Sequence, residues 1–161
     1  MELNPYATFL GSQDARAVLA MTPGLVHQAV SAMTPEEVEA PIAVGKWSPR
    51  QIVAHLADCE LVFCFRLRQT LAMESPVIQP FDQDDWAKQY AAYDLASALA
   101  MFHAAREWNV KLIGALNEAD WQREMTHPER GTMTFQTVVE TMAGHDMNHL
   151  GQLQSVLRSK A

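Results

Sequence analysis

The chain has 161 residues, of which 48% are hydrophobic, and its formal net charge at pH 7 is −7. This length fits a single domain spanning residues 1–161 with a core of its own, and the apolar content is too high for a disordered chain. The acidic balance and the scattered basic residues argue against a nucleic-acid-binding face and against attraction to an anionic membrane.

The start of the chain and its cysteines favour a cytoplasmic protein. The segment MELNPYATFLGSQDARAV lacks the basic and then apolar stretches of a signal peptide. The most apolar run, LADCELVFCF, contains charged residues and is far shorter than the ~20 residues of a membrane-spanning helix. Cys59 and Cys64 match neither a Cys-x-x-Cys motif nor a disulfide framework, so we expect two reduced, buried thiols.

Helical periodicity returns throughout the chain, whereas alternating runs of β-branched residues do not occur. Residues 4–33 predict an interrupted helix that restarts with Thr22 as N-cap and Pro23 at the first position. The sequence TPEE predicts a short capped turn. A long helix then begins at Ser48 and Pro49. Its apolar stripe consists of Ile52, Leu56, Cys59, Val62, Phe63 and Leu67.

Two loops separate the remaining helices. The segment ESPVIQPFDQDDW is predicted as a loop from its prolines and aspartates, and helix resumes at about Asp84, the expected N-cap. The segment THPERGTMT is predicted as a second loop, closed by Thr134 as a cap before a last helix over 135–158. Four long amphipathic segments predict an all-α four-helix bundle with up-and-down or crossover connections.

Three histidines fall on the inner faces of two of these helices. His145 and His149 are four residues apart, about one helical turn, so both imidazoles project from the same face. That face is apolar, because Met142 precedes the pair and Leu153 follows it. His55 occupies the inner stripe of the long second helix. Inward side chains of neighbouring helices meet in a bundle core, so the three imidazoles are expected to converge.

Neutral imidazoles in an apolar core require partners, because each unsatisfied buried polar group costs roughly 1–3 kcal/mol. A divalent metal would bind one nitrogen of each ring, and the other nitrogen would need an acceptor. The alternative is that protein hydrogen bonds alone satisfy the three rings. Of the other histidines, His27 and His103 are expected to be partly exposed. His127 is expected to anchor its loop or to lie near the mouth of the site.

Further polar residues lie close to these positions. Asp146 points about 100° away from the preceding histidine, so it is expected to bond a neighbouring helix, to orient His55, or to lie on the helix surface. Glu60 is expected to pair with an arginine. Arg66 and Arg106 fall near inner stripes, and a buried arginine requires a carboxylate such as Glu60 or Asp146. The alternative for these arginines is binding of an anionic substrate.

Two more residues are candidates for the site itself. Asp85, in the loop before the third long helix, is placed to reach an open metal position or a substrate. Cys59 follows His55 by one helical turn, a spacing that allows thiolate ligation. A small apolar filler in the core is the simpler interpretation of Cys59.

The segments KWSPRQIVAHLADCE, FDQDDWA and THPERGTMTFQTVVETMAGHDMNHLGQLQ together resemble the DinB-like superfamily, in its DinB_2 or YfiT-like branch. The match runs over nearly the whole chain in the right order. Its most specific element is the histidine before the first bundle-core leucine, His55, together with the carboxy-terminal His-Asp-x-x-His. The resemblance implies a four-helix bundle, commonly a homodimer. It also implies that His55, His145 and His149 bind a divalent metal.

Three imidazole ligands leave a coordination position open, which is typical of a catalytic metal site. Imidazoles suit several metals, and we expect zinc or nickel, with iron as a further choice. Superfamily members include transferases that use low-molecular-weight thiols such as bacillithiol, mycothiol or glutathione. The resemblance therefore implies S-transfer from such a thiol to an electrophilic small molecule. Metal-dependent hydrolysis and a non-catalytic, metal-stabilised dimeric bundle are the alternatives.

Overall fold

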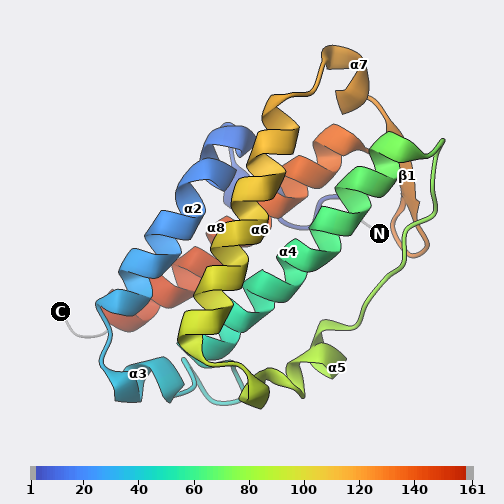
Figure 1. Ribbon diagram of the computed structural model, residues 1–161. Helices are drawn as coiled ribbons and strands as arrows, with labels where there is room; N and C mark the ends of the chain where they lie inside the picture. Colours follow the sequence, from blue (N-terminus) through green and yellow to red (C-terminus); the bar gives the residue numbers. More distant parts are fainter. Residues whose placement is uncertain (1–2, 159–161) are drawn as a thin grey trace.

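Four long helices form a bundle in the computed structural model, which describes residues 3–158 (Figure 1). They are α2 (Ala15–Ser31), α4 (Pro49–Ala72), α6 (Leu95–Gly114) and α8 (Phe135–Arg158). The predicted all-α four-helix bundle is therefore confirmed. Within residues 3–158, no helix combines the length and the apolar character needed to cross a membrane.

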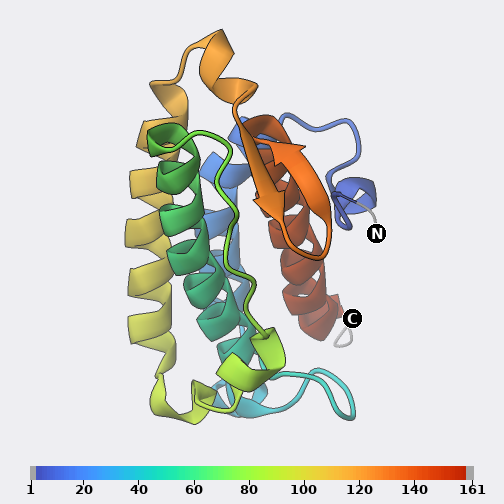
Figure 2. The same cartoon turned by 90° about the vertical axis from the view of Figure 1, so that its right-hand side faces the viewer.

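The helices are not arranged in chain order around the bundle. α2 packs against α6 and α8, and α4 packs against the same two helices, so α2 and α4 lie on a diagonal. α4 and α6 run in one direction, whereas α2 and α8 run in the other (Figure 1). The connection from α4 to α6 therefore returns along the length of the bundle (Figure 2). It contains α5 (Gln83–Ala87) and the 3-10 turn η1 (Tyr90–Ala92).

Capping residues define where the helices begin. Ser48 and Gln51 form a reciprocal capping box at the start of α4, as the Ser-Pro sequence predicts. Thr34 and Glu37 form the same motif at α3 (Pro35–Glu39). At α6, the Asp94 carboxylate accepts a hydrogen bond from the backbone N–H of Ser97 at 2.7 Å. These polar signals lie within four residues of each helix start, which is why the sequence reveals them.

The predicted helix restart at Thr22 is wrong, because α2 continues through Pro23. Proline has no N–H, so the carbonyl of Leu19, four residues earlier, loses its helical donor. Arg106 of α6 replaces that donor, with Nη1 3.2 Å from the Leu19 oxygen. The Thr22 hydroxyl does not cap a helix and instead donates to the Asp146 carboxylate of α8 at 2.6 Å.

The segment predicted as the second loop contains a β-hairpin. β1 (Glu124–His127) pairs antiparallel with β2 (Gly131–Thr134), and the buried side chains of Met125 and Met133 face each other across the pair. The connection from α4 also contacts β1, since the N–H of Ile78 donates to the Thr126 carbonyl at 2.9 Å. The hairpin and this connection cover one side of the bundle next to α8 (Figure 2). The chain reaches the hairpin through α7 (Glu118–Trp121).

Two clusters of buried apolar side chains fill the bundle. The first cluster includes Leu67 of α4 and Val138, Val139, Met142 and Ala143 of α8. The second includes residues 52–54 of α4 together with Leu150 and Leu153 of α8. The segment of α8 between the two clusters carries the histidines that the sequence singles out.

Candidate metal centre

Three buried imidazole rings meet between α4 and α8. The ring centroids of His55 and His145 are 5.0 Å apart, those of His55 and His149 4.8 Å, and those of His145 and His149 4.5 Å. The Nε2 atoms of His55 and His145 are 2.9 Å apart. His55 has no exposed surface. The structure therefore brings together the three residues expected to converge.

An oxygen atom faces the outer nitrogen, Nδ1, of each ring. These oxygens are Tyr90 Oη at 3.4 Å from His55, Asp146 Oδ1 at 4.0 Å from His145 and Gln152 Oε1 at 2.9 Å from His149. With the proton on Nδ1, His55 and His145 present the lone pairs of their Nε2 atoms to each other. Metal-binding histidines commonly have this arrangement, in which an outer oxygen fixes the tautomer and the ring orientation.

Burial keeps the rings of His55 and His149 neutral. Loss of solvent lowers the pKa of His55 to about 2 and that of His149 to about 3, and the neighbouring imidazoles add to the effect by opposing a further positive charge. Neutral imidazole is the form that binds a metal, so no proton has to be displaced from either ring near neutral pH.

The Cys59 thiol also lies in this centre. Its Sγ is 3.5 Å from Nε2 of His55 and 3.9 Å from Nε2 of His145. The ligand atoms of His55, Cys59 and His145 all lie within 4.8 Å of one another, and His149 is outside that group. Burial, together with nearby carboxylates, raises the pKa of the Cys59 thiol, which is therefore protonated in the absence of a metal. In the sequence, the four-residue spacing between His55 and Cys59 indicates that the thiol can lie in this centre.

The donor atoms fit a divalent metal. Four ligands around zinc, with Zn–N distances of about 2.0–2.1 Å, place neighbouring nitrogens roughly 3.4 Å apart. The 2.9 Å separation between Nε2 of His55 and Nε2 of His145 is slightly shorter, so a small rotation of the rings accommodates an ion. A set of imidazole nitrogens with one thiol suits zinc, nickel or iron better than magnesium or calcium.

A buried ionic network lies beside the histidines and joins all four long helices. Arg106 of α6 donates from Nη2 to Glu60 of α4 at 2.8 Å and to Asp146 of α8 at 3.2 Å, and from Nη1 to Thr22 of α2 at 3.0 Å. Although burial acts in the opposite direction, the Arg106 guanidinium holds the pKa of the Asp146 carboxyl below its usual range. Asp146 therefore bonds neighbouring helices, and its interpretation as a helix-surface carboxylate is wrong.

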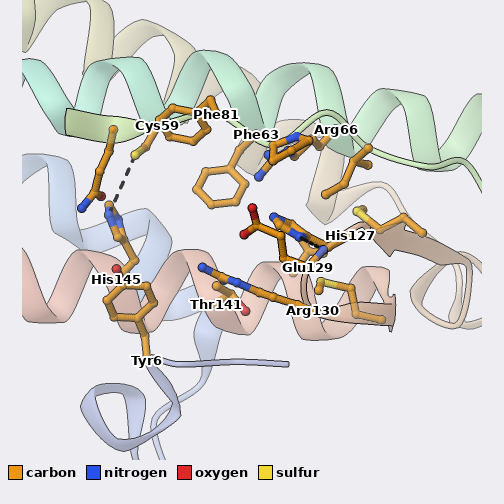
Figure 3. A pocket seen from close by; sticks show the side chains of 16 residues that line it. Tyr6, Cys59, Phe63, Arg66, Phe81, His127, Glu129, Arg130, Thr141 and His145 are labelled. Carbon is orange, nitrogen blue, oxygen red and sulfur yellow. Dashed lines mark hydrogen bonds between the residues drawn. The ribbon is translucent and has the colours of Figure 1, made fainter. Parts of the chain in front are cut away.

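A cavity of ≈ 250 Å³ adjoins the histidines between α4, α8 and the hairpin. Cys59 and His145 lie at one end, and Arg66 and His127 lie at the other (Figure 3). Apolar side chains make up much of the wall between these ends; they include Phe63, Ile78, Phe81, Met125 and Met133. The cavity gives a small molecule access to the wall formed by His145 and Cys59.

The expectation that Asp85 reaches the site is wrong. Asp85 is exposed and forms an ion pair with Lys88, and it does not line the cavity beside His145. The N-cap of α5 is Asp82, whose carboxylate accepts from the N–H groups of Asp84 and Asp85, so the prediction of Asp84 as the cap is also wrong. The helix therefore begins two residues earlier than expected, and Asp84 lines a different pocket together with His149 and Gln152.

The other candidates divide between the cavity and the surface. The Nδ1 atom of His127 accepts from the backbone N–H of Glu129 at 3.2 Å, so His127 anchors the hairpin turn while it lines the cavity. Arg66 donates to the Gln79 carbonyl at 2.6 Å and has no carboxylate partner among residues 3–158, contrary to expectation. His27 is exposed and His103 half-buried, as predicted.

The DinB_2 model of the DinB superfamily matches residues 19–153. The chain belongs to the DinB superfamily. A "putative metal-dependent hydrolase" of Oceanobacillus iheyensis is 29% identical over 140 residues, which cover 86% of this chain and 81% of that protein. YfiT of Bacillus subtilis, which bears the same description, is 27% identical over 144 residues, which cover 88% of this chain and 81% of YfiT.

Two solved structures have the same fold. The structure of YfiT, "a probable metal-dependent hydrolase with an unusual four-helix bundle topology", superposes with a TM-score of 0.85 at 26% identity, covering 91% of this chain and 85% of YfiT. The mycothiol-dependent maleylpyruvate isomerase gives a TM-score of 0.70 at 12% identity, covering 86% of this chain and 59% of the isomerase. At that identity the likeness shows the fold alone.

Proposed function

We propose that this DinB-superfamily protein is a divalent-metal-dependent enzyme that transfers a low-molecular-weight thiol to an electrophilic small molecule. The observation that carries the proposal is the meeting of three buried imidazole rings, one of which, His145, lines a cavity. His55, His145 and His149 would hold the metal through their Nε2 atoms, and zinc, nickel or iron suits these ligands. Cys59, whose ligand atom groups with those of His55 and His145, is a further candidate ligand.

A divalent ion in such a centre supplies a positive charge that lowers the pKa of a thiol or a water molecule in its open coordination position. The residues of the protein set the conditions for that chemistry. Phe63 and Phe81 line the cavity with apolar surface, which weakens the competition from bulk water. Tyr6 packs edge-on to His145, with the ring centroids 5.1 Å apart, and so restricts the orientation of that imidazole.

Two considerations bear on the choice of nucleophile. Transferases that use low-molecular-weight thiols occur in the DinB superfamily, which supports a thiol. Hydrolysis is the second candidate, because relatives that match most of this chain are named metal-dependent hydrolases. The two reactions need the same metal centre and differ only in whether a thiol or water attacks the substrate.

The family resemblance also supports a homodimer, and the sequence composition supports a cytoplasmic location. We include both in the proposal. Light scattering during gel filtration measures the oligomeric state directly, and a mass of twice the 18.0 kDa of the chain is expected.

The test of the proposed function is a nucleophile comparison on metal-loaded protein. The protein is mixed with 1-chloro-2,4-dinitrobenzene and, in turn, with bacillithiol, mycothiol, glutathione and cysteine, while ester hydrolysis is followed in parallel with 4-nitrophenyl acetate. Loss of an outer hydrogen-bond partner of a metal ligand typically lowers activity about 10–100-fold. His149→Ala removes a proposed ligand itself, so it should lower activity by at least that factor. His27→Ala, which changes an exposed histidine outside the centre, is the matched control and should retain full activity.

Acceleration of one thiol reaction that is lost in His149→Ala supports S-transfer. Acceleration of ester hydrolysis alone, with the same loss in the variant, replaces S-transfer by hydrolysis. If neither reaction distinguishes the native protein from His149→Ala, the enzymatic proposal is contradicted and a non-catalytic bundle is left.

A further inference from the structure

Two arginines are buried in this bundle, and they differ in their partners. Arg106 is 2% exposed and contacts the carboxylates of both Glu60 and Asp146. Arg66 is 9% exposed, yet among residues 3–158 no carboxylate forms an ion pair with it. A buried charge without a counter-ion is unfavourable, because the loss of hydration is not offset by a nearby opposite charge.

The guanidinium of Arg66 also has unused hydrogen-bonding capacity. One Nη atom donates to the Gln79 carbonyl at 2.6 Å, whereas the buried Nε atom has no hydrogen-bond partner. The Phe81 ring lies against the guanidinium, 5.8 Å from its carbon atom, and restricts its movement. Burial lowers the pKa of Arg66 to about 10, so the group remains charged at neutral pH. A charged fork of donors therefore lines the cavity without an ion pair to any carboxylate among residues 3–158.

A second cation lies in the same cavity. Arg130, from the turn between β1 and β2, extends into the cavity and forms no ion pair with any residue in the described part of the chain (Figure 3). Glu129 also lines the cavity and carries its negative charge. The cavity wall thus holds two arginines and one carboxylate, in a protein whose formal net charge is −7.

We propose that Arg66 and Arg130 form a carboxylate-binding subsite, which holds a carboxylate of the thiol or of the electrophile so that its reactive end faces His145. Arginine binds planar carboxylates through two parallel hydrogen bonds, and the Arg66 guanidinium has donors beyond the one whose hydrogen bond the Gln79 carbonyl accepts. The subsite deepens the proposed function and rests on it for the orientation of the reactive end. Binding of the carboxylate itself requires no metal.

The binding test uses metal-free protein, so that the ligand cannot coordinate an ion. Isothermal titration at pH 7 compares succinate with its uncharged dimethyl ester. We expect succinate to bind, and Arg66→Met to weaken that binding by about tenfold or more, which is the usual effect of losing a hydrogen bond to a charged group. Arg66→Lys, which keeps the charge but not the fork, should fall between Arg66→Met and the native protein.

Substitutions of the other charged residues in and near the cavity provide further tests. Glu129→Gln removes the one carboxylate of the wall and should tighten succinate binding, whereas Arg130→Met should weaken it. Arg68→Met is the matched control, because Arg68 is on the same helix but donates to Cys64 and Asn109 outside the cavity. This control variant should leave succinate binding unchanged.

Arg130 and Glu129 lie in a hairpin turn, so their variants decide the question even if Arg66→Met does not fold. Equal affinity for succinate and its ester, no detectable succinate binding, or no change in the Arg66 and Arg130 variants would overturn the proposal.

Kinetics on metal-loaded protein identify which reactant carries the carboxylate. Mercaptoacetate is compared with 2-mercaptoethanol as the thiol, and 4-(bromomethyl)benzoate with its methyl ester as the electrophile. Arg66→Met should raise KM about tenfold or more for the acid of one pair and leave the uncharged partner unaffected. A uniform change for all four reactants contradicts the subsite. Absence of turnover with every pair contradicts the proposed function instead, while the titration still decides the subsite.

Discussion

Arg106 connects the four helices through side chains that are all buried. Its guanidinium contacts Thr22, Glu60 and Asp146, and it also donates to the carbonyl that Pro23 leaves without a helical donor. Asp146 in turn faces Nδ1 of His145, at 4.0 Å. One arginine therefore pairs with two carboxylates and donates to the Leu19 carbonyl, and through Asp146 it lies next to a histidine of the centre.

Arg106→Met tests this network. The substitution leaves the buried carboxylates of Glu60 and Asp146 without a counter-ion, and breaking a buried ion pair in this way costs about 3–5 kcal/mol. Urea unfolding should therefore show a loss of that size in the free energy of unfolding. Glu107→Gln, which breaks an exposed ion pair with Lys111 on the same helix, should change it by less than about 1 kcal/mol. Equal effects of the two substitutions would contradict the role assigned to Arg106.

At the scale of elements, the N-terminal segment packs on α8 next to the histidines. α1 (Ala7–Leu10) contacts α8, and the Tyr6 ring lies edge-on to His145. Gly144 permits this approach, because a Cβ atom built at that position would lie 2.3 Å from the Tyr6 carbonyl oxygen. The residue before His145 therefore has to lack a Cβ atom for the segment to cover the centre.

Gly144→Ala should displace the N-terminal segment from α8. We expect the free energy of unfolding to fall by about 1–3 kcal/mol, as for other substitutions that overfill a packed interior. Gly151→Ala is the matched control on the same helix, since nothing lies within 4 Å of the added methyl group. In a helix interior that change is neutral or stabilises by up to about 1 kcal/mol. If both alanine variants unfold at the same urea concentration, the close approach of Tyr6 is not a constraint.

The elements also show what the sequence can and cannot predict. The last helix was predicted over 135–158 and spans Phe135–Arg158, because a long apolar stripe carries a strong periodic signal. The hairpin strands have four residues each, too few for alternation to stand out. The continuation of α2 through Pro23 depends on a donor from α6, which no local signal reveals.

The same limit applies to the site. Convergence of the histidines follows from their spacing on inner faces, and the structure brings the three rings together. The partner of Arg66 does not follow, because it depends on how α4 faces the hairpin and the connection beside it. Spacing thus predicts contacts within and between long helices better than contacts with short connecting segments.

For the whole molecule, burial of neutral histidines couples stability to pH. The pKa of His55 and His149 lies near 2 and 3 in the folded protein, whereas an imidazole in an unfolded chain has a pKa of about 6.5. Between those values the unfolded state binds more protons than the folded state. Acid therefore favours unfolding, and the lowered pKa of the Asp146 carboxyl acts in the same direction below about pH 4.

Metal-free protein should consequently lose stability as the pH falls from about 6.5 towards 3. The slope can reach about 1.4 kcal/mol per pH unit for each buried histidine. Urea unfolding at a series of pH values should show a smaller slope for His149→Leu and an unchanged slope for His27→Gln, which alters an exposed histidine. A native protein whose stability does not change between pH 7 and 4 would contradict burial of neutral rings.

The most direct test of the central claim is the metal content of the purified protein, measured by elemental analysis. Three converging imidazoles predict one equivalent of zinc, nickel or iron per chain. His149→Ala should lower the affinity for that metal at least about 100-fold, while Cys59→Ala should retain it within about tenfold. A metal that survives His149→Ala but is lost with Cys59→Ala would make Cys59 the third ligand. Native protein that neither contains nor binds a divalent metal would contradict the account.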